Sequence, residues 1–545
     1  MLWRDTMNKF IRAMICVLIT LTLFGCNNDT ETTVTDQDPV IQDQVGETDG
    51  PVKTEEMSDF YSPSQMNQYG FLDVWENESY QKAIGRYKEF ALKDFRSSLE
   101  KGENEIVSPL SLYYVLAITA NGAKGNTKNK METALGMSVN DLNLFLNEFD
   151  TANNRDYAPV FNKANALWFN KDLGQLKQEY VDTIRKYYGD SIFERSFGDR
   201  QKITKEVNQW SSDQTDGAID QIVSEDDLDK DSYMLLLNAL VAGGPWSIPF
   251  DAKETLTETF NCYDSSQTAV EMMHQTLFGY WSDKNSEGFA KDLGNGSWFV
   301  AILPNQGIDI YDYIDHMDPN TFSDYIENVH YEDVVGSFKP NYEWNGECPI
   351  VDQHYTNLSF PKFEYEKEYE LEDTLKEFGL KNVFDPKTCD FSGISDGEIY
   401  IQKVKQKCKV EVDEEKAVAA AVTLEIMGKG GGDCLEVRDI IYHDVVFNRP
   451  FLFAFVSDDR QTPLFIGIVN RIGEDGGKAF RIENIAGKIN IRNKPSTTGE
   501  KVGMFEKGQI VYAFEFKKAE GYTWYRIGTD KWVADKGGEW IKAVD

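Results

Sequence analysis

Hydrophobic residues recur every three or four positions along some stretches of the chain and form continuous runs along others. Residues 79–102, SYQKAIGRYKEFALKDFRSSLEKG, have the helical spacing, and 104–136 predict a short strand followed by a helix that begins at Ser108-Pro109. YMLLLNALV at 233–241 is apolar throughout, which is typical of a strand buried on both faces. PFLFAFV and PLFIGIVN flank a polar SDDRQT turn and predict a hairpin. These segments predict a domain in which helices and buried strands are mixed.

The first residues have the pattern of a targeting segment. Three basic residues precede ICVLITLTLFG, an apolar stretch too short to span a bilayer comfortably. The sequence LFGC that follows, ending at Cys26, resembles the lipobox of bacterial lipoproteins, in which this cysteine is diacylated and becomes the mature N-terminus. We therefore expect a signal peptide at residues 1–25 and lipidation of Cys26. An ordinary cleaved signal peptide with a chance cysteine is the alternative.

Residues 26–69 have the composition of a spacer. The part from 27 to 60 contains ten acidic residues, one lysine and almost no bulky apolar side chains, so it cannot form a core and is expected to be disordered. A lipid on Cys26 would tether this stalk to the outer face of a bacterial cell membrane. The expected location is therefore extracellular and lipid-anchored.

Charge and cysteine content narrow the classes of function. The formal net charge of −35 argues against nucleic acid as a partner, since phosphate binding needs a basic face. Removing Cys16 and Cys26 leaves five of the seven cysteines, an odd number without paired spacing, so disulfides are not the framework. The sequence has no metal-binding, phosphate-binding or nucleophile motif, and His274 has no nucleophile motif beside it. We expect no metal, no cofactor and no enzymatic activity.

Segments between residues 70 and 473 resemble the serpin family of serine protease inhibitors. The helix start SPLS and the sequence GAKGNT are followed, in the family's order and at matching spacing, by further segments: ANALWFN, VNQWSSDQTDGAI, LLLNALVAGGPW, LSFPKFEYEKEYELEDTLKEFGLKNVFD, DFSGIS and FNRPFLFAFVSDDRQTPLFIGIVN. The resemblance implies an α+β serpin fold with three β-sheets, eight to nine helices and an exposed reactive-centre loop.

The resemblance places this loop at EVDEEKAVAAAVTLEIMGKGGGDCLEV, residues 411–437. In serpins a protease cleaves the loop, and the loop then inserts into the main sheet as a new strand and traps the acyl-enzyme. The expected hinge consists of Glu414, Glu415, Lys416, Ala417, Val418, Ala419, Ala420, Ala421, Val422 and Thr423. Alternate positions must enter a gap between packed strands, so they must be small or uncharged. The expected inward set is Ala417, Ala419, Ala421 and Thr423.

The loop departs from the family pattern in ways that bear on inhibition. Lys416 stands where the family usually has glycine, and Glu425 would face inward if insertion went that far. The position of the scissile bond remains open, because counting forward from the hinge and counting back from Phe447 differ by nine residues. The candidate residues are Lys429, Gly430, Gly431, Arg438 and Asp439.

A second set of positions corresponds to serpin residues that control opening of the main sheet. Ser108, Ser111 and Asn238 match positions that form hydrogen bonds beneath this sheet, and Gln406 stands where the family commonly has histidine. Glutamine can both donate and accept, so the network could persist without a titrating group. Trp246 matches a tryptophan near the point of loop entry. Plain core packing is the alternative for each of these residues.

Residues 474–545 predict a linker and a small all-β domain. The part from 476 onward has 13 basic and 9 acidic residues, so its balance is opposite to that of the rest of the chain. Its short strands and glycine turns resemble those of bacterial SH3-like domains, which commonly bind cell-wall peptides. Trp524, Tyr525 and Trp532 could contribute to such binding or could belong to the core.

The sequence therefore predicts a monomeric surface lipoprotein that irreversibly inhibits an extracellular serine protease, or a cysteine protease as the less favoured target. Two alternatives stay open. One is a non-inhibitory protein with the serpin fold, whose loop is cleaved without trapping. The other is a cell-wall-binding lipoprotein in which the serpin domain is only a scaffold.

Overall fold

The computed structural model describes most of the chain between residues 75 and 543. The residues outside the description are 1–74, 76, 154–160, 190–191, 216, 218, 220, 229–231, 336–342, 345–348, 398, 418–435, 474–477, 483–487, 508–509, 514, 529–530, 538–539 and 544–545. The predicted signal peptide, Cys26 and the acidic stalk therefore lie outside the described residues. No helix in the described part is long and apolar enough to cross a membrane.

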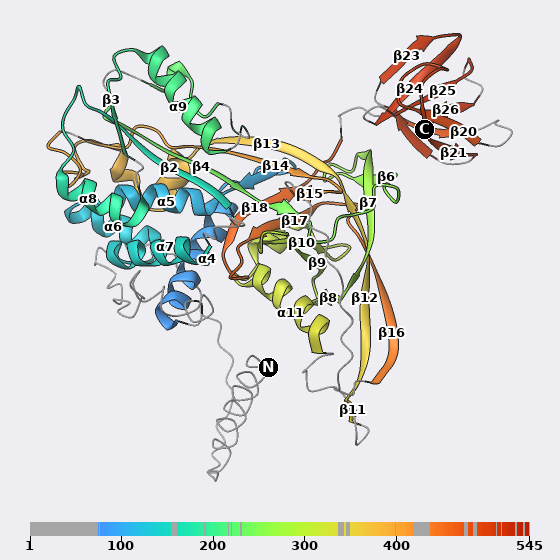
Figure 1. Cartoon of the computed structure of the whole chain (residues 1–545), viewed down its shortest axis with the longest axis horizontal. Coiled ribbons are helices and arrows are strands. Elements are labelled where there is room, and N and C mark those ends of the chain that lie inside the picture. The colour runs from blue at the N-terminus through green and yellow to red at the C-terminus, as the bar shows by residue number, and fades with distance from the viewer. Residues whose placement is uncertain are drawn as a thin grey trace, which may run out of the picture. The chain divides into compact units, whose positions relative to one another are not determined.

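Helices make up most of the first third of the described chain. Figure 1 shows α4, α5, α6 and α7 on one side of strands β2 and β4, with α9 on the other side. The described α-helices are α4 (Glu78–Ser97), α5 (Pro109–Ala120), α6 (Gly125–Leu135), α7 (Val139–Asn153), α8 (Gln178–Tyr188), α9 (Arg200–Gln214), α10 (Ile310–Asp315), α11 (Thr321–Val335) and α12 (Glu372–Glu377). Two short 3₁₀ helices, η1 (Glu225–Asp227) and η2 (Lys381–Phe384), complete the set.

Helix α5 is buried along its whole length, and its start is fixed by local chemistry. Pro109 occupies the first turn, where its missing N–H costs nothing, and the Ser108 hydroxyl accepts the Ser111 N–H. Every residue of α5 is buried, so the helix packs against neighbours on all sides. The predicted helix start at Ser108-Pro109 is confirmed.

One six-stranded antiparallel sheet combines strands from distant parts of the chain, between residues 105 and 469. Its strand order is β1-β18-β17-β10-β9-β8, and the predicted hairpin PFLFAFV–PLFIGIVN forms β17 and β18. Both hairpin strands are buried throughout. The strands are β1 (Glu105–Val107), β8 (Trp281–Ser282), β9 (Ser286–Asp292), β10 (Trp298–Pro304), β17 (Phe451–Val456) and β18 (Pro463–Val469).

A second sheet contains the strand that follows the predicted loop. Strand β16 pairs in parallel with β12, and β12 pairs antiparallel with β7. The strands are β6 (Leu256–Asn261), β7 (Gln267–Phe278), β11 (Glu343–Trp344), β12 (Pro349–Pro361) and β16 (Glu436–Val446).

The main sheet consists of two hydrogen-bonded parts. One part has the order β3-β2-β4, and the other is the antiparallel pair β13-β14. Strands β4 and β14 lie beside each other, but no β-bridge joins them within the described residues. The strands are β2 (Phe161–Asn170), β3 (Ile192–Arg195), β4 (Met234–Ala242), β13 (Phe363–Glu370) and β14 (Lys405–Val412). The predicted apolar run YMLLLNALV supplies β4. The main sheet is divided between β4 and β14.

The C-terminal residues are mostly strands. A five-stranded sheet has the order β21-β20-β25-β24-β23, and a three-stranded sheet has the order β22-β19-β26. Ile489, Phe505, Ile527 and Val533 belong to a small hydrophobic cluster of this region. The strands are β19 (Lys478–Ile482), β20 (Lys488–Arg492), β21 (Lys501–Glu506), β22 (Ile510–Ala513), β23 (Glu515–Ala519), β24 (Tyr522–Gly528), β25 (Lys531–Asp535) and β26 (Ile541–Ala543).

Candidate functional site: the hinge and the divided sheet

The chain reverses direction directly after β14. The Asp413 carboxylate accepts the N–H groups of Glu415 and Lys416, both at 2.9 Å, and the Asp413 N–H donates to the Lys416 carbonyl at 2.9 Å. An aspartate that bonds the following backbone in this way stabilises a tight turn. The turn leads into β15 (Lys416–Ala417), which pairs antiparallel with β5 (Gly244–Pro245). The start of the predicted hinge is therefore already paired at the top of the divided sheet.

Trp246 forms two hydrogen bonds with the backbone of this turn. Its indole N–H donates to the Asp413 carbonyl at 2.9 Å, and its backbone N–H donates to the Glu415 carbonyl at 3.3 Å. The ring is 1% exposed and packs edge-on against Phe250 and Phe299. Trp246 therefore contacts the start of the predicted hinge, and its role in loop entry stays a prediction. The Trp246 side chain both packs in the core and contacts this turn.

Glu414 forms an ion pair that the sequence analysis did not identify. Its carboxylate lies 2.9 Å from the Lys362 ammonium and accepts the Thr255 hydroxyl at 2.8 Å. Burial alone would raise the pKa of Glu414, but Lys362 and Thr255 outweigh it and hold the pKa below its ordinary value. Burial alone would likewise lower the pKa of Lys362, yet the carboxylates beside it raise it. Lys362 lies in the segment LSFPKFEYEK, but the sequence does not indicate its partner, because the pair joins positions far apart in the chain.

Close packing against the hinge requires glycine at position 243. Gly243 has φ +115°, and a Cβ there would lie 2.4 Å from the Ala417 carbonyl oxygen. The Gly243 carbonyl accepts the Asn295 side-chain N–H at 2.9 Å. Only glycine allows the hinge backbone to approach this closely. The glycine before β5 therefore allows tight contact with β15.

Lys416, where the family usually has glycine, is accommodated by an ion pair. Its ammonium lies 3.1 Å from the Glu411 carboxylate, and the side chain is half-buried. Ala417 beside it is completely buried, and the inward direction of its set on insertion stays a prediction. The other predicted hinge residues, Val418, Ala419, Ala420, Ala421, Val422 and Thr423, lie outside the described residues.

The scissile-bond candidates fall into two groups. Lys429, Gly430 and Gly431 lie outside the described residues. Arg438 and Asp439 lie in β16, where the pairing with β12 shifts register between Val351 and Gln353. Asp439 is exposed. A protease would have to separate part of β16 from β12 to cleave there.

Ser108, Ser111 and Gln406 lie together beneath the main sheet, between the start of α5 and strand β14. The Gln406 amide accepts the Ser108 N–H at 3.0 Å and donates to the Ser108 carbonyl at 2.8 Å. The Ser108 hydroxyl bonds the Ser111 hydroxyl at 2.8 Å and donates to the Leu464 carbonyl at 3.0 Å. Gln406 thus ties β14 to α5 through a two-way hydrogen bond.

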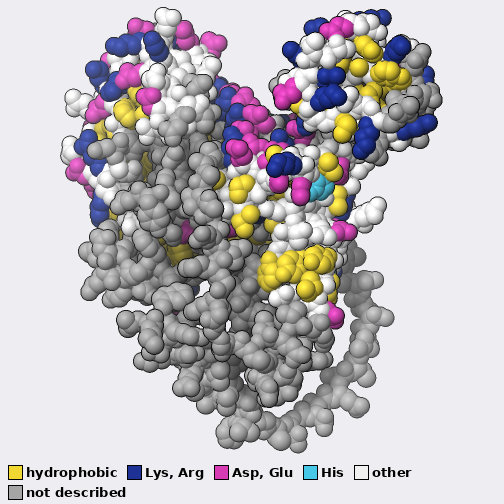
Figure 2. Space-filling model, turned by 45° about the vertical axis from the view of Figure 1, so that its right-hand side comes forward, with side chains coloured by type: hydrophobic (Ala, Val, Ile, Leu, Met, Phe, Trp, Pro, Cys, Tyr) yellow, Lys and Arg dark blue, Asp and Glu magenta, His cyan; other side chains and the backbone are white. Residues whose placement is uncertain are grey.

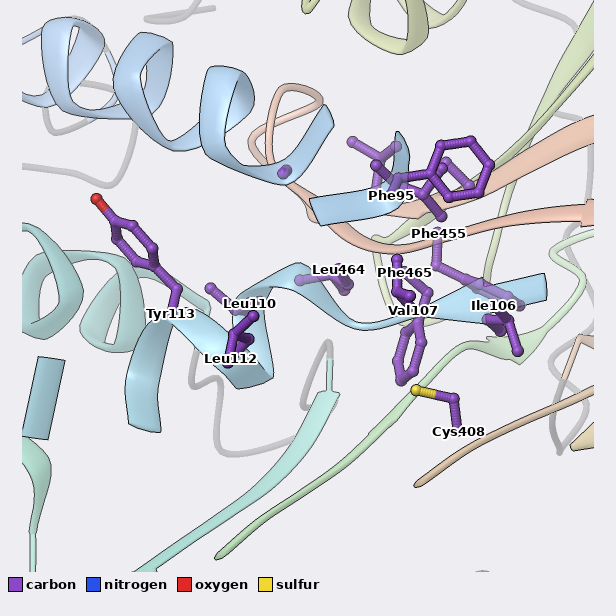
Figure 3. Packing of buried hydrophobic residues seen from close by; sticks show 14 of the residues in the cluster. Phe95, Ile106, Val107, Leu110, Leu112, Tyr113, Cys408, Phe455, Leu464 and Phe465 are labelled. Atoms are coloured by element: carbon purple, nitrogen blue, oxygen red, sulfur yellow. The ribbon is translucent and has the colours of Figure 1, made fainter. Parts of the chain in front are cut away.

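The surroundings of this network are apolar. Cys408, the next inward residue of β14, faces the cluster that contains Val107 and Phe465 (Figure 3). Burial raises the pKa of the Cys408 thiol, so it behaves as a small apolar side chain. Within the described residues, Cys262, Cys389 and Cys408 are free thiols. Asn238 lies in β4 opposite Asn165, but its side chain is outside the description.

The comparisons with known proteins agree with this geometry. The sequence model of the family "Serpin (serine protease inhibitor)" matches residues 86–472. The chain belongs to the serpin family. It is 25% identical to a serpin-like protein of Methanosarcina acetivorans over 86% of this chain and 98% of the relative. It is 26% identical to neuroserpin of Homo sapiens over 67% of this chain and 86% of the relative.

Solved structures lead to the same fold. The thermophilic serpin tengpin in its native state is 28% identical, with a TM-score of 0.59 over 72% of this chain and 94% of that chain. Tengpin in its latent state gives 26% identity and a TM-score of 0.58 over 73% of this chain and 99% of that chain. Serpins are generally protease inhibitors rather than enzymes, which agrees with the expectation drawn from the sequence.

Proposed function

We propose that this serpin is a suicide-substrate inhibitor of a serine protease outside the cell. The observation that supports the proposal most directly is the division of the main sheet between β4 and β14, with the hinge turned back at the top of β14. A strand that continues from this turn would run antiparallel to β14. Residues 418–435 are eighteen in number against eight in β14, so the chain that follows the turn is long enough to fill the gap.

In the proposed mechanism the protease cleaves the loop and remains bound as an ester between its serine and the loop's new carboxyl end. The loop then inserts beside β14, and the attached protease is displaced before water can hydrolyse the ester. Insertion needs Ala417, Ala419, Ala421 and Thr423 to face the core. None of these side chains has a charge that would require desolvation. A cysteine protease, which would form a thioester, is the less favoured target.

Insertion is tested by melting the full chain before and after cleavage in the loop by a non-target protease. We expect the melting temperature to rise sharply on cleavage, since insertion adds a buried strand with its full set of hydrogen bonds. A cleaved chain that melts at the temperature of the intact chain has not inserted its loop.

A non-inhibitory serpin is the second candidate function, and Lys416 is the observation that favours it. The ion pair between Lys416 and Glu411 fixes the start of the hinge, where the usual glycine would leave the backbone free to rearrange. The variant Lys416→Gly separates the two candidates. Trapping by this variant but not by the natural chain would support a loop that is only a substrate, whereas trapping by both would support inhibition.

We further propose that Cys26 bears the lipid, that the protein lies on the outer face of a bacterial membrane, and that it is a monomer. The residues after 473 are proposed to form an SH3-like domain, which the two small sheets and their shared cluster support. Trp524 and Trp532 are both buried, so these two rings serve the packing of that region. Cell-wall binding with the serpin domain as scaffold therefore has less support than inhibition.

A further inference from the structure

A hollow lies between helix α9 and the strands β2 and β3, away from the hinge. Its volume is about 490 Å³, which is in the usual range for small-molecule sites. The lining residues that matter here are Trp168, Phe193, Lys202, Lys205, Gln209 and Trp210. None of them takes part in the proposed trapping mechanism.

Three aromatic rings form the apolar part of this hollow. Trp168 and Phe193 are stacked with ring centroids 4.4 Å apart, and Trp210 lies edge-on to each at 6.3 Å. Phe193 and Trp210 are only half-buried. Partly exposed rings arranged in this way can bind a planar aromatic group by offset stacking and edge contacts.

The indole N–H of Trp168 is buried without an acceptor in the described structure. The side chain is 1% exposed, and its Nε1 has no hydrogen-bond partner. A buried donor in this state costs about 1–3 kcal/mol, and native structures rarely leave such groups unused. This unused donor belongs to one of the residues that line the hollow.

The charge that remains available at the hollow is positive. Lys202 and Lys205 are both exposed on α9 and have no ion-pair partner among the described residues. Glu206 is already paired with Arg195 at 2.5 Å. Asp213 accepts the side-chain N–H of Gln209 at 2.8 Å but keeps its negative charge. Two lysines against this one carboxylate leave a net positive charge beside the aromatic hollow, which favours an anionic ligand. On the face drawn in Figure 2, basic and acidic side chains lie close together over parts of the described surface.

We propose that this hollow binds a small planar aromatic anion, such as an aromatic carboxylate. The rings would contact the aromatic face, while Lys202 and Lys205 would attract the negative group. The proposal does not depend on whether the loop traps a protease.

The test uses 1-naphthoate and its neutral analogue 1-naphthamide with the purified full chain in isothermal titration calorimetry. We expect 1-naphthoate to bind with a Kd below about 1 mM and 1-naphthamide to bind roughly tenfold more weakly. The variant Lys202→Gln/Lys205→Gln should weaken naphthoate binding about tenfold and leave naphthamide binding unchanged. The matched control Lys186→Gln, an exposed lysine of α8 that does not line the hollow, should change neither.

Trp210→Leu tests the aromatic wall, with circular dichroism and melting temperature to show that the variant is folded. Loss of naphthoate binding in a folded variant supports the site. Absence of naphthoate binding by the natural chain, or equal binding by Trp210→Leu, would overturn the proposal. So would equal affinity for the charged and neutral probes.

Discussion

The two-way hydrogen bond between Gln406 and Ser108 should make a measurable contribution to stability, and Gln406→Leu tests it. The variant keeps a side chain of similar size in a site that is 5% exposed, but it removes both the donor and the acceptor. The Ser108 carbonyl keeps a second bond, because it also accepts the Leu112 N–H at 3.3 Å. The Ser108 N–H has only Gln406 as acceptor among the described contacts. The main cost is therefore a buried N–H without a partner.

The magnitude follows from these two losses. One hydrogen bond to a carbonyl that remains partly satisfied is worth about 1 kcal/mol, and an unsatisfied buried N–H costs about 1–3 kcal/mol. We expect Gln406→Leu to lower the free energy of unfolding by about 2–4 kcal/mol. Urea unfolding followed by circular dichroism measures this change. The matched control is Gln402→Leu, since Gln402 is exposed and its described side-chain contact is with Tyr400.

Identical urea midpoints for Gln406→Leu and the natural chain would refute this reasoning. The same result would follow if leucine stabilised the core by as much as the hydrogen bonds did. Gln406→Ala separates the two cases, because it removes the same two hydrogen bonds without adding the apolar contacts of leucine.

Three further predictions concern ionisable groups. Asp94 is buried with both carboxylate oxygens unpaired, and burial raises its pKa to about 7. The folded state therefore loses stability as pH rises from about 4 to 7 and this carboxyl must ionise. Asp94→Asn should raise the free energy of unfolding at pH 8 by up to about 4 kcal/mol. Urea titrations at pH 4 should show no gain. His354 and His443 lie 2.8 Å apart through their ring nitrogens, and burial, with the neighbouring histidine, lowers the pKa of His443. Stability should thus fall as pH drops below about 6.5, and His443→Asn should flatten the melting temperature between pH 7.5 and 5.5; an unchanged slope would contradict this. Burial would raise the pKa of Glu414, but Lys362 and Thr255 outweigh it and hold the pKa below its ordinary value; Glu414→Gln should therefore destabilise the hinge at pH 7, and this effect should fade as pH falls below the ordinary value of 4.5. Glu415→Gln, at an exposed position, should have no effect at either pH in hydrogen-exchange measurements of β15.

The sequence predicted those parts of the fold that depend on local pattern. The helix start at Ser108-Pro109 and the strands β4, β17 and β18 follow from capping and hydrophobic runs. Ser108 and Gln406 were placed together by family resemblance, and the structure describes the bonds between them. Periodicity alone could not have predicted this contact, because it joins residues 298 positions apart.

The parts that the sequence did not predict depend on tertiary contacts. Lys362 pairs with Glu414 only because β13 begins beside the end of β14. The aromatic hollow combines Trp168 of β2 with Trp210 of α9; both lie in segments that resemble the serpin family, but nothing in the sequence indicates that their rings meet. Lys416 was identified as a departure from the family pattern, but its partner Glu411 was not, since an ion pair at this separation requires the turn at Asp413.

The central claim, covalent trapping of a protease, is tested most directly on a denaturing gel. The full chain is incubated with trypsin-, chymotrypsin-, elastase- and subtilisin-like proteases, and the released C-terminal fragment is weighed by mass spectrometry. We predict a gel-stable complex with at least one protease, and a fragment whose mass identifies the scissile bond. Cleavage between Glu425 and Asp439 by every protease, without any stable complex, would contradict the inhibitory account.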